Sequence, residues 1–145
     1  MRMKMSPHIS MVTLGVADIA KATAFYERLG FKKSGASQEA VSFLKAGPAV
    51  LGLFGRDALQ EDAKAGNIWT GNGGTAVAMN YASEAEVDAM MAKAEEAGAS
   101  ILKPAEKAFW GGYSGYFADL DGHAWEVAHN PFWPMQEDGR IDLPE

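Results

Sequence analysis

A strand–helix–strand pattern occurs twice along this chain of 145 residues, and the duplication restricts the possible folds more than any other feature. In the first half, the apolar run 9–16 precedes Asp18, a residue suited to capping a helix, and then apolar residues at helical spacing. In the second half, the run 75–82 precedes Ser83, which with Glu86 forms a capping-box pattern before another helical stripe. About three further strands are predicted after each helix. We therefore expect two similar βαβββ modules, each too small to fold well alone.

The two predicted modules are joined by a polar, glycine-rich connection. Module one is expected at about 8–56, the connection at about 57–73, module two at about 74–131, and a C-terminal tail at 132–145. The connection is expected to contain at most one short helix, after Asp57. The predicted fold class is α+β, with tandem βαβββ modules that form a curved, cup-like mixed sheet with helices on its outer face.

Alternation of side chains along the strands predicts which face of each sheet lines the cup. In the strand expected at 123–129, Trp125 and Val127 lie on the bulky face, which should pack on a helix. Glu126 lies on the other face, together with Ala124 and Ala128. The first strand of each module shows the same division into a bulky face and a face of mostly small or mildly polar residues. Glu126 is therefore predicted to project into the cup.

Composition excludes several classes of function. The formal net charge of −6 argues against nucleic-acid binding, because phosphates would be repelled. The chain has no cysteine, which rules out disulfides and zinc–thiolate sites. No apolar stretch approaches the roughly 20 residues that span a bilayer. The N-terminus lacks the hydrophobic segment of a signal peptide, so we expect a cytoplasmic protein that binds neither nucleic acid nor membrane.

Two stretches carry a family resemblance. ISMVTLGVADIAKATAFYERLGF (9–31) and YFADLDGHAWEV (116–127), together with the duplication, resemble the vicinal oxygen chelate superfamily. This superfamily includes glyoxalase I, bleomycin resistance proteins, extradiol dioxygenases and fosfomycin resistance enzymes. The resemblance covers nearly the whole chain, but it does not select one activity. It implies a small-molecule ligand in the cup and a homodimer.

The resemblance also implies four positions at which the superfamily's metallo-enzymes hold a divalent metal. In this chain those positions fall on Met11, on Ala76, near Leu51 and on Glu126. Hard divalent ions need several oxygen or imidazole donors, and among the four only Glu126 supplies one. His123 and His129 lie an odd number of residues from Glu126, so on a regular strand they face the other way. We therefore expect no divalent metal and no other cofactor.

Glu126 has three possible roles. It could be a retained acid that is hydrogen-bonded to neighbouring tyrosine, tryptophan or water, because a buried carboxyl group needs such partners. It could anchor a cationic or polar ligand without chemistry. It could also act as a general base that removes an acidic C–H proton in a partly desolvated cup.

Other candidate ligand contacts are polar or aromatic side chains near the predicted cup. Thr13 and Asn80 are polar residues that could face it, and Trp110 and Tyr113 flank the glycines of a predicted loop. Trp69 lies on the connection, where it could cover a ligand or only hold the loop. Phe132 and Trp133 lie between two prolines, cannot form a regular helix, and are expected to pack on the sheet edge, the cup mouth or a second subunit.

Three functions are consistent with these observations. The first is a metal-independent small-molecule binder similar to bleomycin resistance proteins, with a cationic or aromatic ligand. The second is a glyoxalase-like lyase or isomerase that uses Glu126 as its catalytic residue, with or without a metal. The third is a scaffold module whose cup is vestigial. Three of the four metal positions implied by the resemblance hold residues that cannot bind a hard metal ion, which favours the small-molecule binder and the scaffold over the lyase or isomerase.

Overall fold

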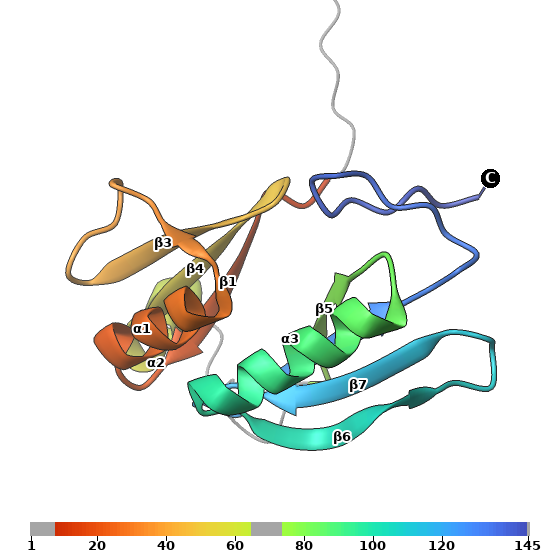
Figure 1. Cartoon of the computed structure of the whole chain (residues 1–145). Coiled ribbons are helices and arrows are strands. Elements are labelled where there is room, and N and C mark those ends of the chain that lie inside the picture. Colours follow the sequence, from red (N-terminus) through yellow and green to blue (C-terminus); the bar gives the residue numbers. More distant parts are fainter. Residues whose placement is uncertain (1–7, 65–73, 145) are drawn as a thin grey trace, which may run out of the picture.

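The computed structural model describes residues 8–64 and 74–144, and in this part of the chain it contains two four-stranded mixed sheets (Figure 1). The first sheet has the order β1 (Met11–Val16), β4 (Ala49–Gly55), β3 (Val41–Ala46), β2 (Lys32–Lys33). The second has the order β5 (Ala76–Asn80), β8 (Ala124–His129), β7 (Tyr113–Ala118), β6 (Ser100–Lys107). In each sheet the first strand pairs in parallel with the last, and the remaining pairs are antiparallel. The predicted α+β class and the tandem arrangement are confirmed.

Both long helices begin where the sequence predicts. In α1 (Ile19–Leu29), the Asp18 carboxylate accepts a hydrogen bond from the backbone N–H of Lys21 at 3.0 Å. In α3 (Glu84–Ala97), the Ser83 hydroxyl accepts from the N–H of Glu86 at 3.2 Å. Each helix ends at a glycine in the left-handed conformation, which closes the last turn without a steric penalty.

A few predicted boundaries move by one to three residues. The first strand begins at Met11 rather than Ile9, and the strand expected at 31–34 contains only Lys32–Lys33. The helix α2 (Arg56–Ala63) occupies the beginning of the predicted connection and starts one residue before Asp57.

The predicted division of strand faces determines the core. Trp125 is 3% exposed and Val127 is fully buried, whereas Glu126, which lies between them, is half-buried. Leu14 and Val16 of β1 are buried in the same way. The helices α1 and α3 pack on these bulky faces and also contact each other, so they lie between the two sheets (Figure 1). The face of each sheet opposite its helix is the one we call the cup face.

A buried hydrogen-bond network joins the two modules. The hydroxyl of Tyr26, on α1, donates to the Asp119 carboxylate at 2.5 Å, and the Trp125 indole N–H donates to the same hydroxyl at 3.0 Å. The other oxygen of Asp119 accepts from the backbone N–H groups of Asp121 and His123. Burial, and then the Asp119 charge, raise the pKa of Tyr26 far above its ordinary value. The Asp-Leu-Asp-Gly turn of module two is therefore fastened to the helix of module one.

Candidate functional site

Glu126 lies in a row of side chains that crosses the second sheet on its cup face. The register of the sheet pairs Ala78 with Glu126, Glu126 with Tyr116, and Tyr116 with Lys103. Ala78 and Lys103 are exposed, and Glu126 and Tyr116 are half-buried. The prediction that Glu126 belongs to the face opposite the helix agrees with this register. Its role remains a prediction.

The Tyr116 hydroxyl interacts with the Glu126 carboxylate. Burial raises the pKa of Tyr116 above its ordinary value, the Glu126 charge and a hydrogen bond to Glu126 raise it further, and Lys103 partly opposes the shift. A carboxylate, a phenol and an ammonium group thus lie side by side across three strands. This arrangement can bind a polar ligand, and it can also carry a proton between Glu126 and a bound molecule.

The coupling between Tyr116 and Glu126 predicts a change in titration. In Glu126→Gln the carboxylate charge is lost, so the pKa of Tyr116 should fall toward its ordinary value of about 10. Burial is the largest cause of the shift and is unchanged, so the pKa should not fall completely. Ring-labelled tyrosine NMR against pH measures this, and Glu106→Gln, on the neighbouring strand, is the charge-matched control. An unchanged Tyr116 titration in Glu126→Gln would contradict the pairing.

The structure moves one of the four predicted metal positions by a residue. Thr13 pairs with Gly52 in the first sheet as Ala78 pairs with Glu126 in the second, so the counterpart of Glu126 is Gly52. Leu51, near which the position was expected, is 2% exposed and faces α1 in the core. Its counterpart in module two is Trp125, which also lies in the core. Gly47 and Gly122 align in the sequence, but Gly52 lies five residues after Gly47, whereas Glu126 lies four residues after Gly122. Alternation then places Leu51 on the opposite face.

The corrected set of positions is still a poor metal site. Met11, which is 44% exposed, lies with its thioether against Gly52, where an added Cβ would be 3.3 Å from the sulfur. Ala76 contributes only a methyl group, so Glu126 remains the one hard donor among the four. Within residues 8–64 and 74–144, no group of three or more His, Cys, Asp or Glu side chains is placed to hold a metal ion. The residues present do not fit a hard divalent cation, which needs several oxygen or imidazole donors.

The two histidines near Glu126 have structural partners. The His129 ring nitrogen Nδ1 lies 2.9 Å from the backbone oxygen of Tyr81, and the His123 nitrogen Nε2 lies 2.7 Å from that of Gly15. Both bonds hold the end of one element against another. Neither histidine joins the row that contains Glu126, in agreement with their odd spacing from it.

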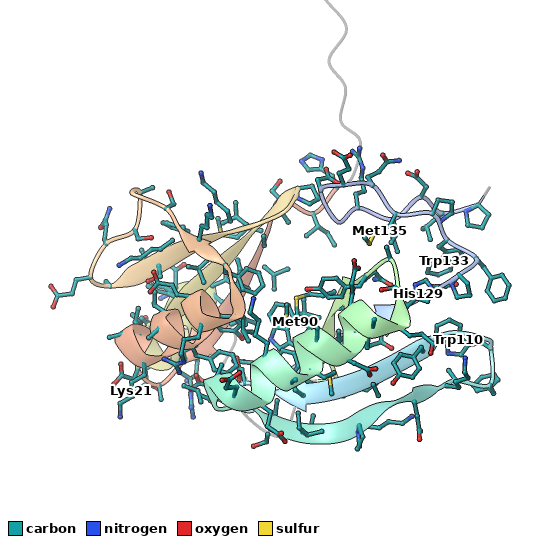
Figure 2. The ribbon with its side chains drawn as sticks, in the orientation of Figure 1. Lys21, Met90, Trp110, His129, Trp133 and Met135 are labelled. Atoms are coloured by element: carbon teal, nitrogen blue, oxygen red, sulfur yellow. The ribbon has the colours of Figure 1, made fainter. Side chains whose placement is uncertain are left out.

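The other predicted ligand residues are spread over the molecule. Thr13 is exposed on the cup face of the first sheet, and Asn80 is half-buried at the end of β5. Tyr113 lies on the helix side of β7, where its hydroxyl donates to Asp88 of α3 at 2.6 Å. Trp110 is 38% exposed in the loop at the tip of the β6–β7 hairpin (Figure 2). Trp69 lies outside the described residues.

The aromatic residues of the tail approach the same hairpin tip. The Phe132 ring packs on Gly111, where an added Cβ would lie 3.0 Å from it. Phe132 remains 66% exposed and Trp133 38% exposed, and Figure 2 shows Trp133 on the same side of the molecule as Trp110. Phe132 therefore contacts the loop between β6 and β7, and the packing of this pair on a sheet edge, the cup mouth or a second subunit stays a prediction.

Tyr116 is a functional candidate that the sequence prediction did not place beside Glu126. Its place opposite Glu126 depends on the Asp119–Gly122 turn, in which the Asp119 N–H donates to the carbonyl of His123 at 3.0 Å. Counting outward from this turn pairs Tyr116 with Glu126. The sequence alone predicts this pair only if the length of the turn is assumed correctly, because the turn sets the register of the two strands.

Comparisons with known proteins agree with this architecture. The profile of the Glyoxalase/Bleomycin resistance protein/Dioxygenase superfamily matches residues 8–127. The chain belongs to this superfamily. It is also the vicinal oxygen chelate superfamily that the two sequence stretches resemble. No curated protein matches the chain closely enough to count as a relative.

Solved structures of the superfamily have the same fold. A glyoxalase-related enzyme from Fulvimarina pelagi is 34% identical, with a TM-score of 0.84, and the match covers 95% of this chain and 99% of that one. A lactoylglutathione lyase from Agrobacterium tumefaciens is 24% identical, with a TM-score of 0.67, over 90% of this chain and 99% of that one. The second likeness concerns the fold alone. Within residues 8–64 and 74–144, no helix is both long and apolar enough to cross a membrane.

Proposed function

We propose that this superfamily member is a metal-independent small-molecule-binding protein whose cup ligand is a cationic, partly aromatic molecule. The observation that carries the proposal is the composition of the four cup positions: Met11, Gly52, Ala76 and Glu126. One carboxylate among a thioether, a hydrogen and a methyl group is suited to one charged contact inside an otherwise apolar surface. This set is unsuited to a multidentate cation site.

The pair Glu126–Tyr116 supports a cationic ligand. The carboxylate can form a charge-assisted hydrogen bond to an ammonium or guanidinium group, and the tyrosine ring next to it can contact the same cation through its face. Phe43 occupies the corresponding place beside Gly52 in the first sheet, so aromatic rings flank both halves of the cup face. The net charge of −6 adds a weak, long-range attraction for a cation.

The cup faces also support a homodimer. Within the chain the helices lie between the two sheets, so the cup faces do not enclose a common space (Figure 1). The strands β1 and β5 are sheet edges, with exposed cup residues Met11, Ala76 and Ala78. A second copy that brings its β5 sheet beside the β1 sheet would cover both edges and complete a cup. Analytical ultracentrifugation should then give a mass of twice 15.5 kDa.

The metal question is tested on protein purified without chelator. We expect no stoichiometric metal by elemental analysis. We also expect no increase in the unfolding temperature on addition of Ni²⁺, Zn²⁺, Mn²⁺ or Fe²⁺. An ion that bound only the folded state would raise that temperature. Glu126→Ala is the matched variant. A stoichiometric ion and a thermal shift that disappears in Glu126→Ala would overturn the proposal of metal independence.

The ligand class is tested by thermal shifts with matched compounds. An aromatic amine should raise the unfolding temperature more than its neutral isostere, and Glu126→Gln should remove the difference. Equal shifts for the two compounds would contradict a cationic ligand. No shift with any compound would favour a scaffold with a vestigial cup.

A lyase or isomerase remains the second candidate, and the specific observation in its favour is Tyr116. A phenol bonded to the Glu126 carboxylate can return a proton that Glu126 has taken from a substrate. The similar protein from Fulvimarina pelagi, described as a glyoxalase-related enzyme, also supports this candidate. NMR in D₂O would detect exchange of an acidic C–H proton of a bound ketone or aldehyde, and the exchange should disappear in Glu126→Gln.

A further inference from the structure

A hollow of about 860 Å³ lies between the two modules, apart from Glu126. Its walls include the end of α1, the strand β5, one side of α3 and a C-terminal segment. Apolar side chains dominate it, and they include Leu29, Val77, Met79, Met90, Trp125 and Met135. The volume is within the range of about 300–1,000 Å³ that is usual for small-molecule sites. Figure 2 shows Met90 and Met135 on facing sides of this space.

The C-terminal segment forms one wall of the hollow because it has an ordered conformation of its own. The N–H of Gln136 donates to the carbonyl of Arg140 at 2.7 Å, and the N–H of Asp142 donates to that of Pro134 at 2.8 Å. The loop closed by these bonds rests on the β3–β4 turn, where an added Cβ on Gly47 would lie 2.3 Å from the Asp138 carbonyl oxygen. The wall is therefore a folded hairpin that contacts module one.

Two polar groups at the end of β5 have little to bind within the protein. Asn80 is half-buried and lines the hollow, and no hydrogen bond involves its side-chain amide within residues 8–64 and 74–144. Among the described residues, the Tyr81 hydroxyl donates only to the Met79 sulfur, at 3.6 Å, and a thioether is a weak acceptor. A half-buried polar group without a good partner is destabilising unless a ligand or water supplies one.

The charged groups at the rim do not favour an ion. Lys45 and Arg140 are exposed there, and so are Glu137 and Asp138, so the formal charges cancel. The interior offers apolar contacts, the sulfur atoms of three methionines, and the amide and hydroxyl at the end of β5. Methionine side chains adapt to flat and irregular apolar ligands and make favourable contacts with aromatic rings.

We infer that this hollow is a second binding site, which does not include Glu126 or Tyr116, for an uncharged, mainly aromatic molecule that carries one hydrogen-bonding group such as a hydroxyl or carbonyl. The ring system contacts the methionines and Trp125, and the polar group bonds to Asn80 and Tyr81. The site belongs to one chain and needs no residue of a second copy. It differs from the cup in ligand charge, and its wall includes Val77 and Met79 on the helix face of β5 as well as Ala78 and Asn80 on the other face.

The inference is tested with N-phenyl-1-naphthylamine, a neutral aromatic probe whose fluorescence increases in apolar surroundings. The full-length protein should show saturable binding of one probe per chain. Val77→Phe places a ring in the hollow and should weaken binding at least tenfold, whereas Ala85→Phe, on the exposed side of α3, should leave it within twofold. Circular dichroism checks that both variants are folded.

Two comparisons identify where the probe binds. Ala76→Phe enlarges the neighbouring residue of β5 on the cup face, and loss of binding in this variant but not in Val77→Phe would overturn the inference. Competition provides a second readout that needs no enlarged side chain. 1-Naphthol should displace the probe at a several-fold lower concentration than naphthalene, and Asn80→Leu should remove that preference. Equal displacement by the two compounds, or no saturable binding, would also overturn it.

Discussion

Replacement of Asp119 by alanine should lower the free energy of unfolding by about 3–5 kcal/mol, because several buried donors lose their acceptor together. Asp119 is 5% exposed and accepts from the Tyr26 hydroxyl and from the backbone N–H groups of Asp121 and His123. A buried donor that is left unpaired costs about 1–3 kcal/mol. The loss also removes a buried hydrogen bond between the two modules, because Tyr26 belongs to module one.

Urea unfolding monitored by tryptophan fluorescence measures the effect of the Asp119 substitution. Asp119→Asn keeps one carbonyl oxygen as an acceptor and should lose less stability than the alanine variant. Asp138→Ala is the control, because Asp138 is exposed and, in the part of the chain that the structure describes, its carboxylate accepts only from the N–H of Arg140. Its loss should therefore be about 0.5 kcal/mol or less. Equal losses for Asp119→Ala and Asp138→Ala would show that the network does not hold the modules together.

Replacement of Trp125 by alanine is expected to have a similarly large effect, about 3–5 kcal/mol. Trp125 stacks on Phe117 with ring centroids 6.1 Å apart and an interplanar angle of 1°, and its indole N–H donates to Tyr26. Truncation therefore removes a large buried surface, an aromatic contact and a hydrogen-bond donor. Trp125→Phe keeps part of the packing and should show an intermediate loss.

Glu126 provides the comparison for Trp125, because it is the next residue along β8 and faces the cup. Glu126→Ala removes a half-buried carboxylate and its bond to Tyr116, so it should change stability by about 1 kcal/mol or less. Adjacent residues are thus expected to differ several-fold in their effect on stability. Equal effects in thermal unfolding would mean that the strand is shifted by one residue, which moves every side chain to the opposite face.

Local patterns were sufficient to predict most of the secondary structure. Asp18 and Ser83 cap the two long helices as expected, because a side-chain oxygen next to the first turn acts over three residues and needs no distant partner. Alternation along β8 correctly separated Trp125 from Glu126, because strand geometry permits only two faces. The boundaries that moved, such as the start of β1, depend on where a partner strand ends.

The candidate site was predicted less completely. Glu126 was identified from its place in the alternation, but Tyr116 lies beside it only because the turn between their strands has a particular length. The position in module one was expected near Leu51, and the pairing of β1 with β4 places it at Gly52, because the register between two strands decides which residue faces α1. Register depends on turn geometry and on pairing between strands, and neither is visible in one strand alone.

The sequence by itself determined the duplication, the caps and the bulky and small faces of the strands, because each of these depends on residue type and short spacing. Only the tertiary structure decided how the two modules meet. The bond between Tyr26 and Asp119 joins residues 93 positions apart, and the hollow is bounded by α1, β5, α3 and the C-terminal segment together. Such contacts follow from the packing of whole elements in three dimensions, for which local spacing carries no information.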